Sequence, residues 1–192
     1  MVTLRAVREG TEREAGRPAM VLVGPPGAGK STVGALLADR LGVSFTDVDE
    51  LIVARAGRSI SDIFTTDGES TFRALEEDEV AAALCRDRGV LALGGGAVLS
   101  ERTRTALRGH HVVFLSVGMA EGVRRTGLST ARPLLAGVNP RATFAALLDA
   151  RLPLYREVAT VEVPTDRRSP EDVALDALGT LGPVGDGAGG VR

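Results

Sequence analysis

Short aliphatic runs alternate along the chain with longer stretches whose apolar residues recur at helical spacing. The aliphatic runs fall at 20–23, 44–48, 90–93, 112–117 and 160–163. Between the first two runs, Val33, Leu36, Leu37 and Leu41 follow the spacing of an amphipathic helix. Alternation of strands with helices predicts right-handed crossovers and a parallel sheet covered on both faces. We therefore expect an α/β fold, with a five-stranded parallel sheet as the middle of three layers.

The remaining segments indicate how the chain is organised around this domain. We expect residues 1–18 to be a flexible extension, residues 19–181 the folded domain, and residues 182–192, with five glycines, a disordered tail. Residues 127–139 are rich in Gly, Pro, Ser and Thr, and this composition predicts a mobile loop. Gly42 and Gly89 follow helical stretches, which they are expected to end.

A phosphate-binding motif follows the first predicted strand. Residues 24–31 read GPPGAGKS and fit GxxxxGK[ST], with an amphipathic helix after them. Glycines let backbone N–H groups approach phosphate oxygens, and the helix N-terminus adds its positive end. Lys30 would bridge the β- and γ-phosphates, and the Ser31 hydroxyl would bind Mg²⁺. The motif predicts nucleotide contacts from six consecutive residues: Gly27, Ala28, Gly29, Lys30, Ser31 and Thr32.

The lysine content decides between the possible nucleotides. Guanine-binding switch proteins carry a second lysine in an Asn-Lys-x-Asp segment, and Lys30 is the only lysine of this chain. ATP is therefore the expected phosphoryl donor. A chance match to the motif in a chain with 24 glycines is the alternative, and the flanking strand and helix argue against it.

Two further features should lie near the γ-phosphate, because ligands of parallel sheets bind at the carboxyl ends of the strands. Asp47 and Asp49 end the second strand and would point the same way, one toward the water shell of Mg²⁺ and the other toward an attacking hydroxyl. The alternative is a helix N-cap at Asp49. The third strand runs into Gly94, Gly95 and Gly96, which indicate close approach of backbone to a ligand, although a tight turn is the simpler explanation.

From about residue 20 to 177 the chain resembles the shikimate kinase family. The resemblance is carried by GPPGAGKSTVG, TDVDELIVARAGRSISDIF, DGESTFRALEEDEV, LALGGGAV, EGVRRTG, ARPLL and ARLPLYREVA, in that order. It implies the fold of nucleoside monophosphate kinases, with a P-loop and a mobile lid at about 127–139. It also implies that ATP phosphorylates the 3-hydroxyl of shikimate, giving 3-phosphoshikimate and ADP in aromatic amino acid biosynthesis, with Mg²⁺ as cofactor.

The resemblance also implies roles for individual residues. Asp49 would contact the shikimate hydroxyls and act as base, while Asp47 would lie near Mg²⁺ through water. Arg73 and Arg151 would bind the shikimate carboxylate, Glu76 would orient the acceptor-binding arginine, and the three glycines would contact substrate. The nucleotide side would be completed by the lid residue Arg132 over the phosphates and by Arg125 and Arg168 beside adenine. Lys30, Asp49 and Arg132 would then be the catalytic residues.

Chemistry alone would not select these arginines, because 22 of the 23 basic residues are arginine. A guanidinium matches a carboxylate with a two-pronged fork, but each arginine also has a simpler explanation. Arg73 could form a surface pair with Glu76 three residues later, Arg151 could be a solvated helix residue, and Arg132 a loop charge. Leu128 and Ser129 depart from the Gly-Asn that the lid of this family often has.

Composition limits the other possible functions. The net charge is −2 and 44% of residues are hydrophobic, so nothing indicates nucleic acid or a membrane as partner. No apolar run approaches the roughly 18 residues of a membrane span, and the first 18 residues contain three Glu and no apolar core. We expect a cytoplasmic monomer acting on small molecules. Cys85, the single cysteine, should be a small buried hydrophobe. A gluconate- or adenylate-kinase-like enzyme and a non-catalytic ATP-binding regulatory module are the alternative functions.

Overall fold

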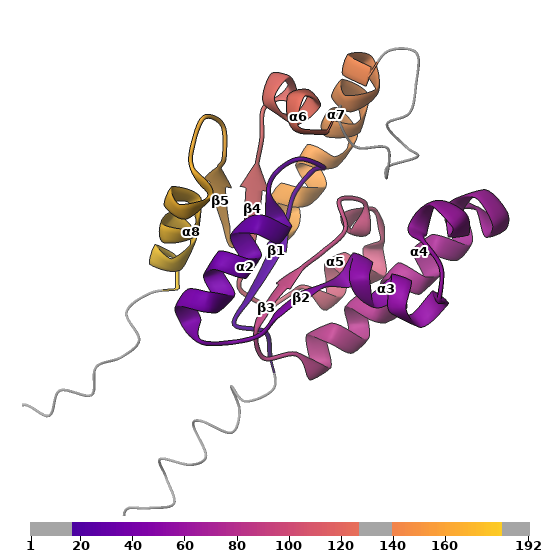
Figure 1. Cartoon of the computed structure of the whole chain (residues 1–192), viewed down its shortest axis with the longest axis horizontal. Coiled ribbons are helices and arrows are strands. Elements are labelled where there is room, and N and C mark those ends of the chain that lie inside the picture. The colour runs from indigo at the N-terminus through magenta and orange to yellow at the C-terminus, as the bar shows by residue number, and fades with distance from the viewer. Residues whose placement is uncertain (1–16, 127–139, 182–192) are drawn as a thin grey trace, which may run out of the picture.

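The computed structural model describes residues 17–126 and 140–181. Its centre is a parallel sheet with the strand order β2-β3-β1-β4-β5 (Figure 1). Each strand begins and ends within one residue of the predicted bounds, which confirms the predicted α/β class. The strands are β1 (Met20–Val23), β2 (Phe45–Asp47), β3 (Val90–Ala92), β4 (Val112–Ser116) and β5 (Val161–Pro164).

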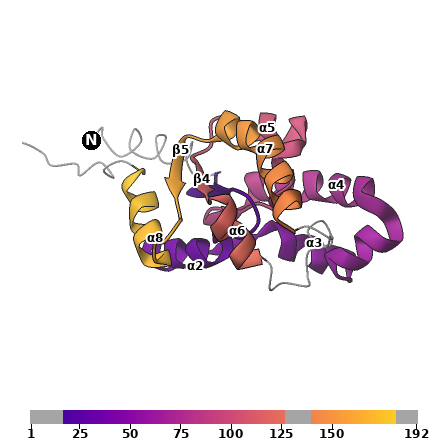
Figure 2. The same ribbon diagram turned by 90° about the horizontal axis from the view of Figure 1, so that it is seen from above.

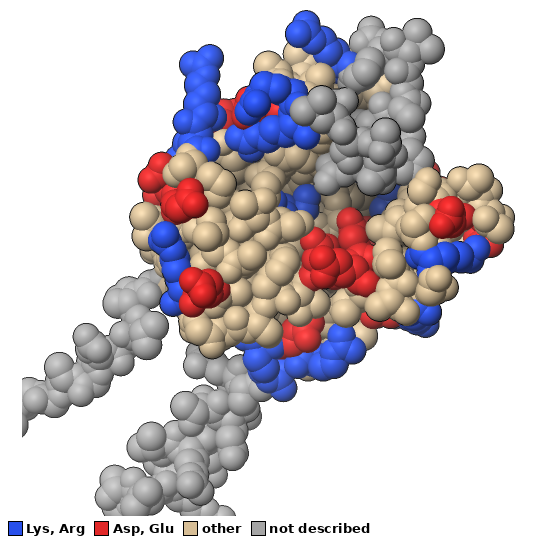
Figure 3. Space-filling model, in the orientation of Figure 1, with Lys and Arg blue, Asp and Glu red and all other residues tan. Residues whose placement is uncertain are grey.

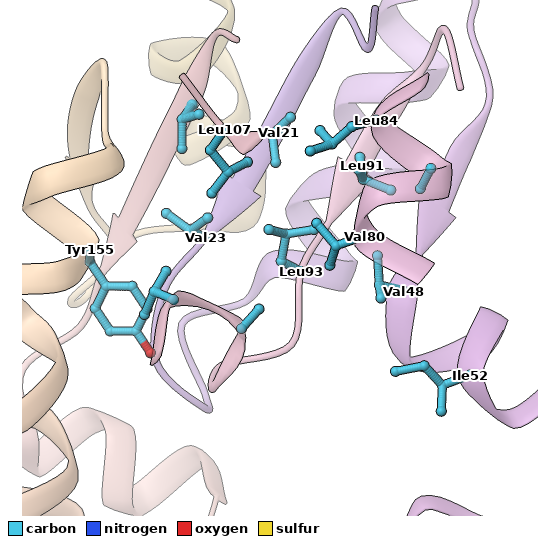
Figure 4. Close-up of a cluster of buried hydrophobic side chains, with 14 of the residues drawn as sticks. Val21, Val23, Val48, Ile52, Val80, Leu84, Leu91, Leu93, Leu107 and Tyr155 are labelled. Atoms are coloured by element: carbon cyan, nitrogen blue, oxygen red, sulfur yellow. The ribbon is translucent and has the colours of Figure 1, made fainter. Parts of the chain in front are cut away.

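Helices cover both faces of this sheet. In β1 every side chain is buried, and alternate residues belong to different cores. Val21 and Val23 pack with α4, α5 and α7, in the cluster drawn in Figure 4, whereas Met20 and Leu22 pack with α2 and α8. The main covering helices are α2 (Lys30–Leu41), α4 (Ile60–Arg86), α5 (Glu101–Ala106), α7 (Pro140–Val158) and α8 (Pro170–Gly179).

Three shorter elements lie at or near the carboxyl ends of the strands: α3 (Val48–Ala56), the 3-10 helix η1 (Ala97–Leu99) and α6 (Met119–Thr126). The α3–α4 pair and α8 lie at opposite ends of the sheet (Figure 2). Inside α4, Gly68 has φ 84° and ψ 168°, a backbone conformation open almost only to glycine. The helix therefore kinks between the segment that packs on α3 and the segment that packs on the sheet.

The structure confirms one predicted helix end and corrects another. Gly42 ends α2 in the left-handed conformation, with φ 66°, and donates its N–H to Ala38 and Asp39. Gly89 does not end a helix, because α4 stops at Arg86 and Asp87 is its C-cap. A side chain at position 89 would instead overlap the carbonyl oxygen of Ser44. Glycine is needed there so that the chain entering β3 can pass close to the chain entering β2.

Cys85 is exposed, contrary to the prediction. The buried side of α4 is formed by Val80, Ala83 and Leu84, and Cys85 points away from it. Among the described residues, no helix is long and apolar enough to cross a membrane.

Pro18 is buried and Arg17 donates to the Gly109 carbonyl at 2.9 Å, while the expected domain bounds stay a prediction. The predicted mobile loop at 127–139, most of the predicted extension and the tail at 182–192 lie outside the described residues.

Candidate active site

The phosphate loop connects β1 to α2 as the motif predicts. Gly24 leaves β1 with φ 149°, and a side chain there would overlap the carbonyl oxygen of Leu115 on β4. Gly29 caps α2 in the left-handed conformation, with φ 90°, and no side chain of residues 17–126 or 140–181 caps that end of the helix. The first N–H groups of α2 therefore face the loop, as a phosphate-binding helix end requires.

Lys30 is the first residue of α2, and its ammonium lies against the phosphate loop. Nζ donates to the carbonyl oxygens of Gly24 at 2.8 Å and Pro25 at 3.2 Å. These contacts hold the only lysine over the loop that would surround the phosphates. Its position matches the role that the motif predicts for it.

Ser31 and Asp47 meet beside the loop, although they come from different elements. The Ser31 hydroxyl donates to Asp47 Oδ2 at 2.7 Å, and Asp47 Oδ1 accepts from the Asp49 N–H at 3.0 Å. Asp47 is thus the N-cap of α3, not Asp49 as the alternative interpretation had it. The strand ends at Asp47, so Asp49 lies in the first turn of α3 and does not share a strand face with Asp47.

The two aspartates nevertheless line the same hollow. This hollow is also lined by Glu50, Val53 and Ile60 and has a volume of about 340 Å³. Figure 3 shows acidic atoms gathered in a depression on this face of the molecule. A hydroxyl and a carboxylate are ligands that Mg²⁺ prefers, so Ser31 and Asp47 fit the predicted metal site. The described residues contain no cluster of three or more His, Cys, Asp or Glu side chains suited to a metal.

The three glycines after β3 each contact a different part of the site. A Cβ atom at Gly94 would lie 2.5 Å from Glu76 Oε1 and 2.8 Å from Asp49 Oδ1. A Cβ atom at Gly95 would lie 3.0 Å from Pro26 of the phosphate loop, and one at Gly96 would overlap the Arg73 guanidinium. One glycine would suffice for a turn. At all three, charged side chains or the phosphate loop approach this backbone closely, so a larger side chain at any of them would displace a neighbour. We call residues 94–96 the glycine segment.

Arg73 is held beside this segment by two carboxylates of α4. Its Nη1 lies 2.5 Å from Glu76 Oε2, and its Nη2 lies 3.0 Å from Glu69 Oε1. Glu76 is only 2% exposed, so this pair is not the surface pair of the alternative interpretation. Burial raises the pKa of Glu76, and the charge of Arg73 opposes that shift. Glu76 Oε1 has no hydrogen-bond partner among the described residues, although it lies beside Gly94.

Arg151 reaches the same segment from α7. Its side chain is nearly buried, and Nη1 donates to the Gly95 carbonyl at 3.0 Å. It is therefore not a solvated helix arginine. Arg73 and Arg151, which are far apart in the sequence, contact adjacent glycines and form two cationic groups on one wall of the site.

Tyr155 contacts the same carbonyl as Arg151. Its hydroxyl donates to the Gly95 oxygen at 2.5 Å. The sequence analysis did not single out this residue and missed the contact. Its spacing of four residues from Arg151 placed both on one side of a helix, and this was the available signal.

A second hollow lies on the other side of the phosphate loop. It has a volume of about 280 Å³, and Arg125 and Arg168 line it together with Gly29, Thr32 and Thr165. Arg125 donates to the carbonyls of Gly27 at 3.2 Å and Thr165 at 2.9 Å. The structure thus brings together the two arginines predicted for adenine. Thr165 was missed, although it directly follows β5 at the ligand-binding edge of the sheet.

One predicted catalytic residue remains unplaced. Arg132, with Leu128 and Ser129, lies outside the described residues, so its approach to the phosphates stays a prediction. The other predicted residues surround the phosphate loop, with those predicted to bind the acceptor on one side and the pair predicted for adenine on the other.

Comparisons with known proteins agree with this arrangement. The shikimate kinase family model matches residues 26–181. The chain is 70% identical to a shikimate kinase of Saccharopolyspora erythraea over 161 residues, covering 84% of this chain and 91% of that protein. It is 58% identical to one of Salinispora arenicola over 164 residues, covering 85% and 98%. A shikimate kinase structure from Acinetobacter baumannii in complex with shikimate has a TM-score of 0.82 at 36% identity, covering 89% and 96%.

Proposed function

The chain belongs to the shikimate kinase family and phosphorylates shikimate with ATP, and we propose that the groups around the glycine segment direct the phosphoryl group to the 3-hydroxyl. The products are 3-phosphoshikimate and ADP. The observation that supports this assignment most directly is the convergence on residues 94–96. An acidic pair, two arginines and the phosphate loop meet there within contact distance of three consecutive residues.

The nucleotide would bind across the phosphate loop. Backbone N–H groups of residues 27–32 and the Lys30 ammonium would hold the phosphates, and Arg125 and Arg168 would flank adenine in the 280 Å³ hollow. Phosphoryl transfer passes through a loose transition state, so the protein acts mainly by positioning and by neutralising charge. Lys30 and, from the lid at 127–139, Arg132 would supply positive charge to the transferring group.

Ser31 and Asp47 would hold Mg²⁺, Ser31 directly and Asp47 through water. When bound, the ion would neutralise charge on the phosphate oxygens. The contact between the Ser31 hydroxyl and Asp47 supports this site, because it places two oxygen ligands at the mouth of the loop.

The acceptor would bind on the other side, between α3, α4 and α7. Arg73 and Arg151 would grip the carboxylate, since a guanidinium can donate two parallel hydrogen bonds to it. Asp49 would orient the 3-hydroxyl and accept its proton. The position of Asp49 Oδ1 next to Gly94, with the arginines next to Gly95 and Gly96, supports this orientation of the substrate.

Steady-state turnover with Mg-ATP and a panel of acceptors tests the proposal. Shikimate should turn over far faster than gluconate or AMP, and NMR of the product should show phosphate on the 3-oxygen. Lys30→Met should lose nearly all activity while the protein remains folded. Phosphorylation at another oxygen, or most of the turnover retained in Lys30→Met, would contradict the assignment.

We also propose that the enzyme acts as a monomer in the cytoplasm, without nucleic acid or membrane as partner. The net charge of −2 and a site built within one chain support this. Size-exclusion chromatography with light scattering would test the oligomeric state.

A further inference from the structure

Tyr155, the only tyrosine of the chain, is fully buried but does more than fill space. Its ring stacks on Phe114 of β4, with centroids 5.0 Å apart and planes at 20°. Figure 4 shows the side chain extending from α7 into the core cluster. The hydroxyl at the end of the ring donates to the Gly95 carbonyl at 2.5 Å. The apolar part of the residue is thus fixed by the core, and its polar end reaches the glycine segment.

The Gly95 carbonyl is shared between Tyr155 and Arg151. Arg151 Nη1 donates to the same oxygen at 3.0 Å. The two residues are one helical turn apart on α7, so they lie on the same side of the helix. A carbonyl oxygen has two lone pairs and can accept both hydrogen bonds. The place of the Arg151 guanidinium therefore depends on a carbonyl whose own position is held by Tyr155.

Gly95 also packs against the phosphate loop. A Cβ atom there would lie 3.0 Å from Pro26 Cδ and 3.4 Å from the Gly24 carbonyl oxygen. The hydrogen bond from Tyr155 is thus made to the backbone that separates Arg151 from the phosphate loop. A shift of this backbone would change the distance between the group that binds the carboxylate and the group that binds the phosphates.

The hydroxyl of Tyr155 remains a donor at the pH values at which such an enzyme works. Burial raises the pKa of Tyr155 above its ordinary value, and the positive charge of Arg151 only partly opposes this. The buried phenol therefore stays neutral and keeps its proton for the Gly95 carbonyl.

We propose that Tyr155 is a positioning residue for shikimate: its hydroxyl fixes the Gly95 carbonyl, and through it the Arg151 guanidinium, at the distance from the phosphate loop that transfer requires. This inference rests on the proposed function, because it needs Arg151 to bind the shikimate carboxylate. A role in core packing alone would leave the substrate preference of the enzyme unaffected.

Tyr155→Phe tests the proposal, since it removes the hydroxyl and keeps the ring on Phe114. The KM for shikimate should rise about tenfold, as expected for one lost hydrogen bond, while the KM for ATP should stay within about twofold. Leu107→Ala is the matched control, because it removes a buried side chain from the same core cluster and leaves both the Phe114 ring and the Tyr155 hydroxyl. It should lower the Tm without a selective effect on shikimate. Equal effects of Tyr155→Phe on both KM values, or none, would overturn the proposal.

A double variant shows whether Tyr155 acts through Arg151. If it does, Arg151→Ala combined with Tyr155→Phe should be no worse for shikimate than Arg151→Ala alone. Full additivity of the two losses would overturn the coupling. Failure of the proposed function itself would look different, because Arg151→Ala alone would then leave the KM for shikimate unchanged.

Discussion

Gly96→Ala should weaken shikimate binding indirectly, by displacing Arg73 rather than by contacting the substrate. In the structure a Cβ atom at position 96 would overlap both terminal nitrogens and the central carbon of the Arg73 guanidinium. The glycine backbone is fixed by β3 on one side and η1 on the other, so the arginine must move. Its pairing with Glu76 Oε2, at 2.5 Å, would be broken or distorted.

The size of the effect follows from the two contacts that Arg73 would lose. A hydrogen bond to a charged group contributes about 1.5–3 kcal/mol. Losing such a contact to the shikimate carboxylate corresponds to a rise in KM of roughly tenfold to a hundredfold. Glu76, only 2% exposed, would also lose its partner, so the free energy of unfolding should fall by about 1–3 kcal/mol.

Steady-state kinetics with shikimate and ATP varied separately, together with urea unfolding, would measure both effects. Gly179→Ala is the matched control, because no atom of the described residues lies within 4 Å of a Cβ atom there. It should leave both KM values unchanged. A Gly96→Ala enzyme with a normal KM for shikimate would show that Arg73 does not bind the acceptor from the position it has in the structure.

Three further predictions test the nucleotide side, the kink in α4 and the buried carboxylate. Arg125→Ala should raise the KM for ATP about tenfold and leave the KM for shikimate unchanged, since Arg125 lines the hollow that we propose for adenine. Gly68→Ala should lower the free energy of unfolding by about 1–3 kcal/mol, measured in urea, because φ is 84° at that position; unchanged stability would mean that the kink is not required. Burial raises the pKa of Glu76, so the folded protein binds the carboxyl proton more tightly than the unfolded chain does. The protonated carboxyl therefore stabilises the fold at low pH. That stabilisation is lost as pH rises from the ordinary carboxyl range through the raised pKa. Because Gln does not titrate, the stability of wild type relative to Glu76→Gln should fall as pH rises over that interval, and a constant difference would contradict the raised pKa.

The fold was largely predictable because its signals are local. The β1 run is apolar at every position since both faces of that strand are covered, and the phosphate loop depends on residues adjacent in sequence. The errors were also local in origin. Gly89 resembled a helix end, but the reason for it is the passing chain at Ser44. Cys85 was taken as buried although it falls just outside the apolar side of α4.

The acceptor site was less predictable because it depends on contacts between distant parts of the chain. Nothing in the sequence near Arg73 or Arg151 distinguishes them chemically from the other arginines, and resemblance to a family selected them. The structure supplies the physical reason, since both contact the glycine segment. Asp49 lines one hollow with Asp47, but the local geometry predicted for it was wrong, because strand β2 is shorter than its apolar run indicated.

The glycine segment explains how these distant residues can act on one small acceptor. A larger side chain at position 94 would displace Glu76 and Asp49. One at position 95 would displace the phosphate loop, and one at position 96 would displace Arg73. Because the glycines have no side chains, the groups that bind the carboxylate and the phosphates can all pack directly against this backbone. The buried Tyr155 hydroxyl donates a hydrogen bond to the Gly95 carbonyl of that backbone. Specificity for a hydroxylated acid would thus depend on where three glycines lie, as much as on the charged residues that touch the substrate.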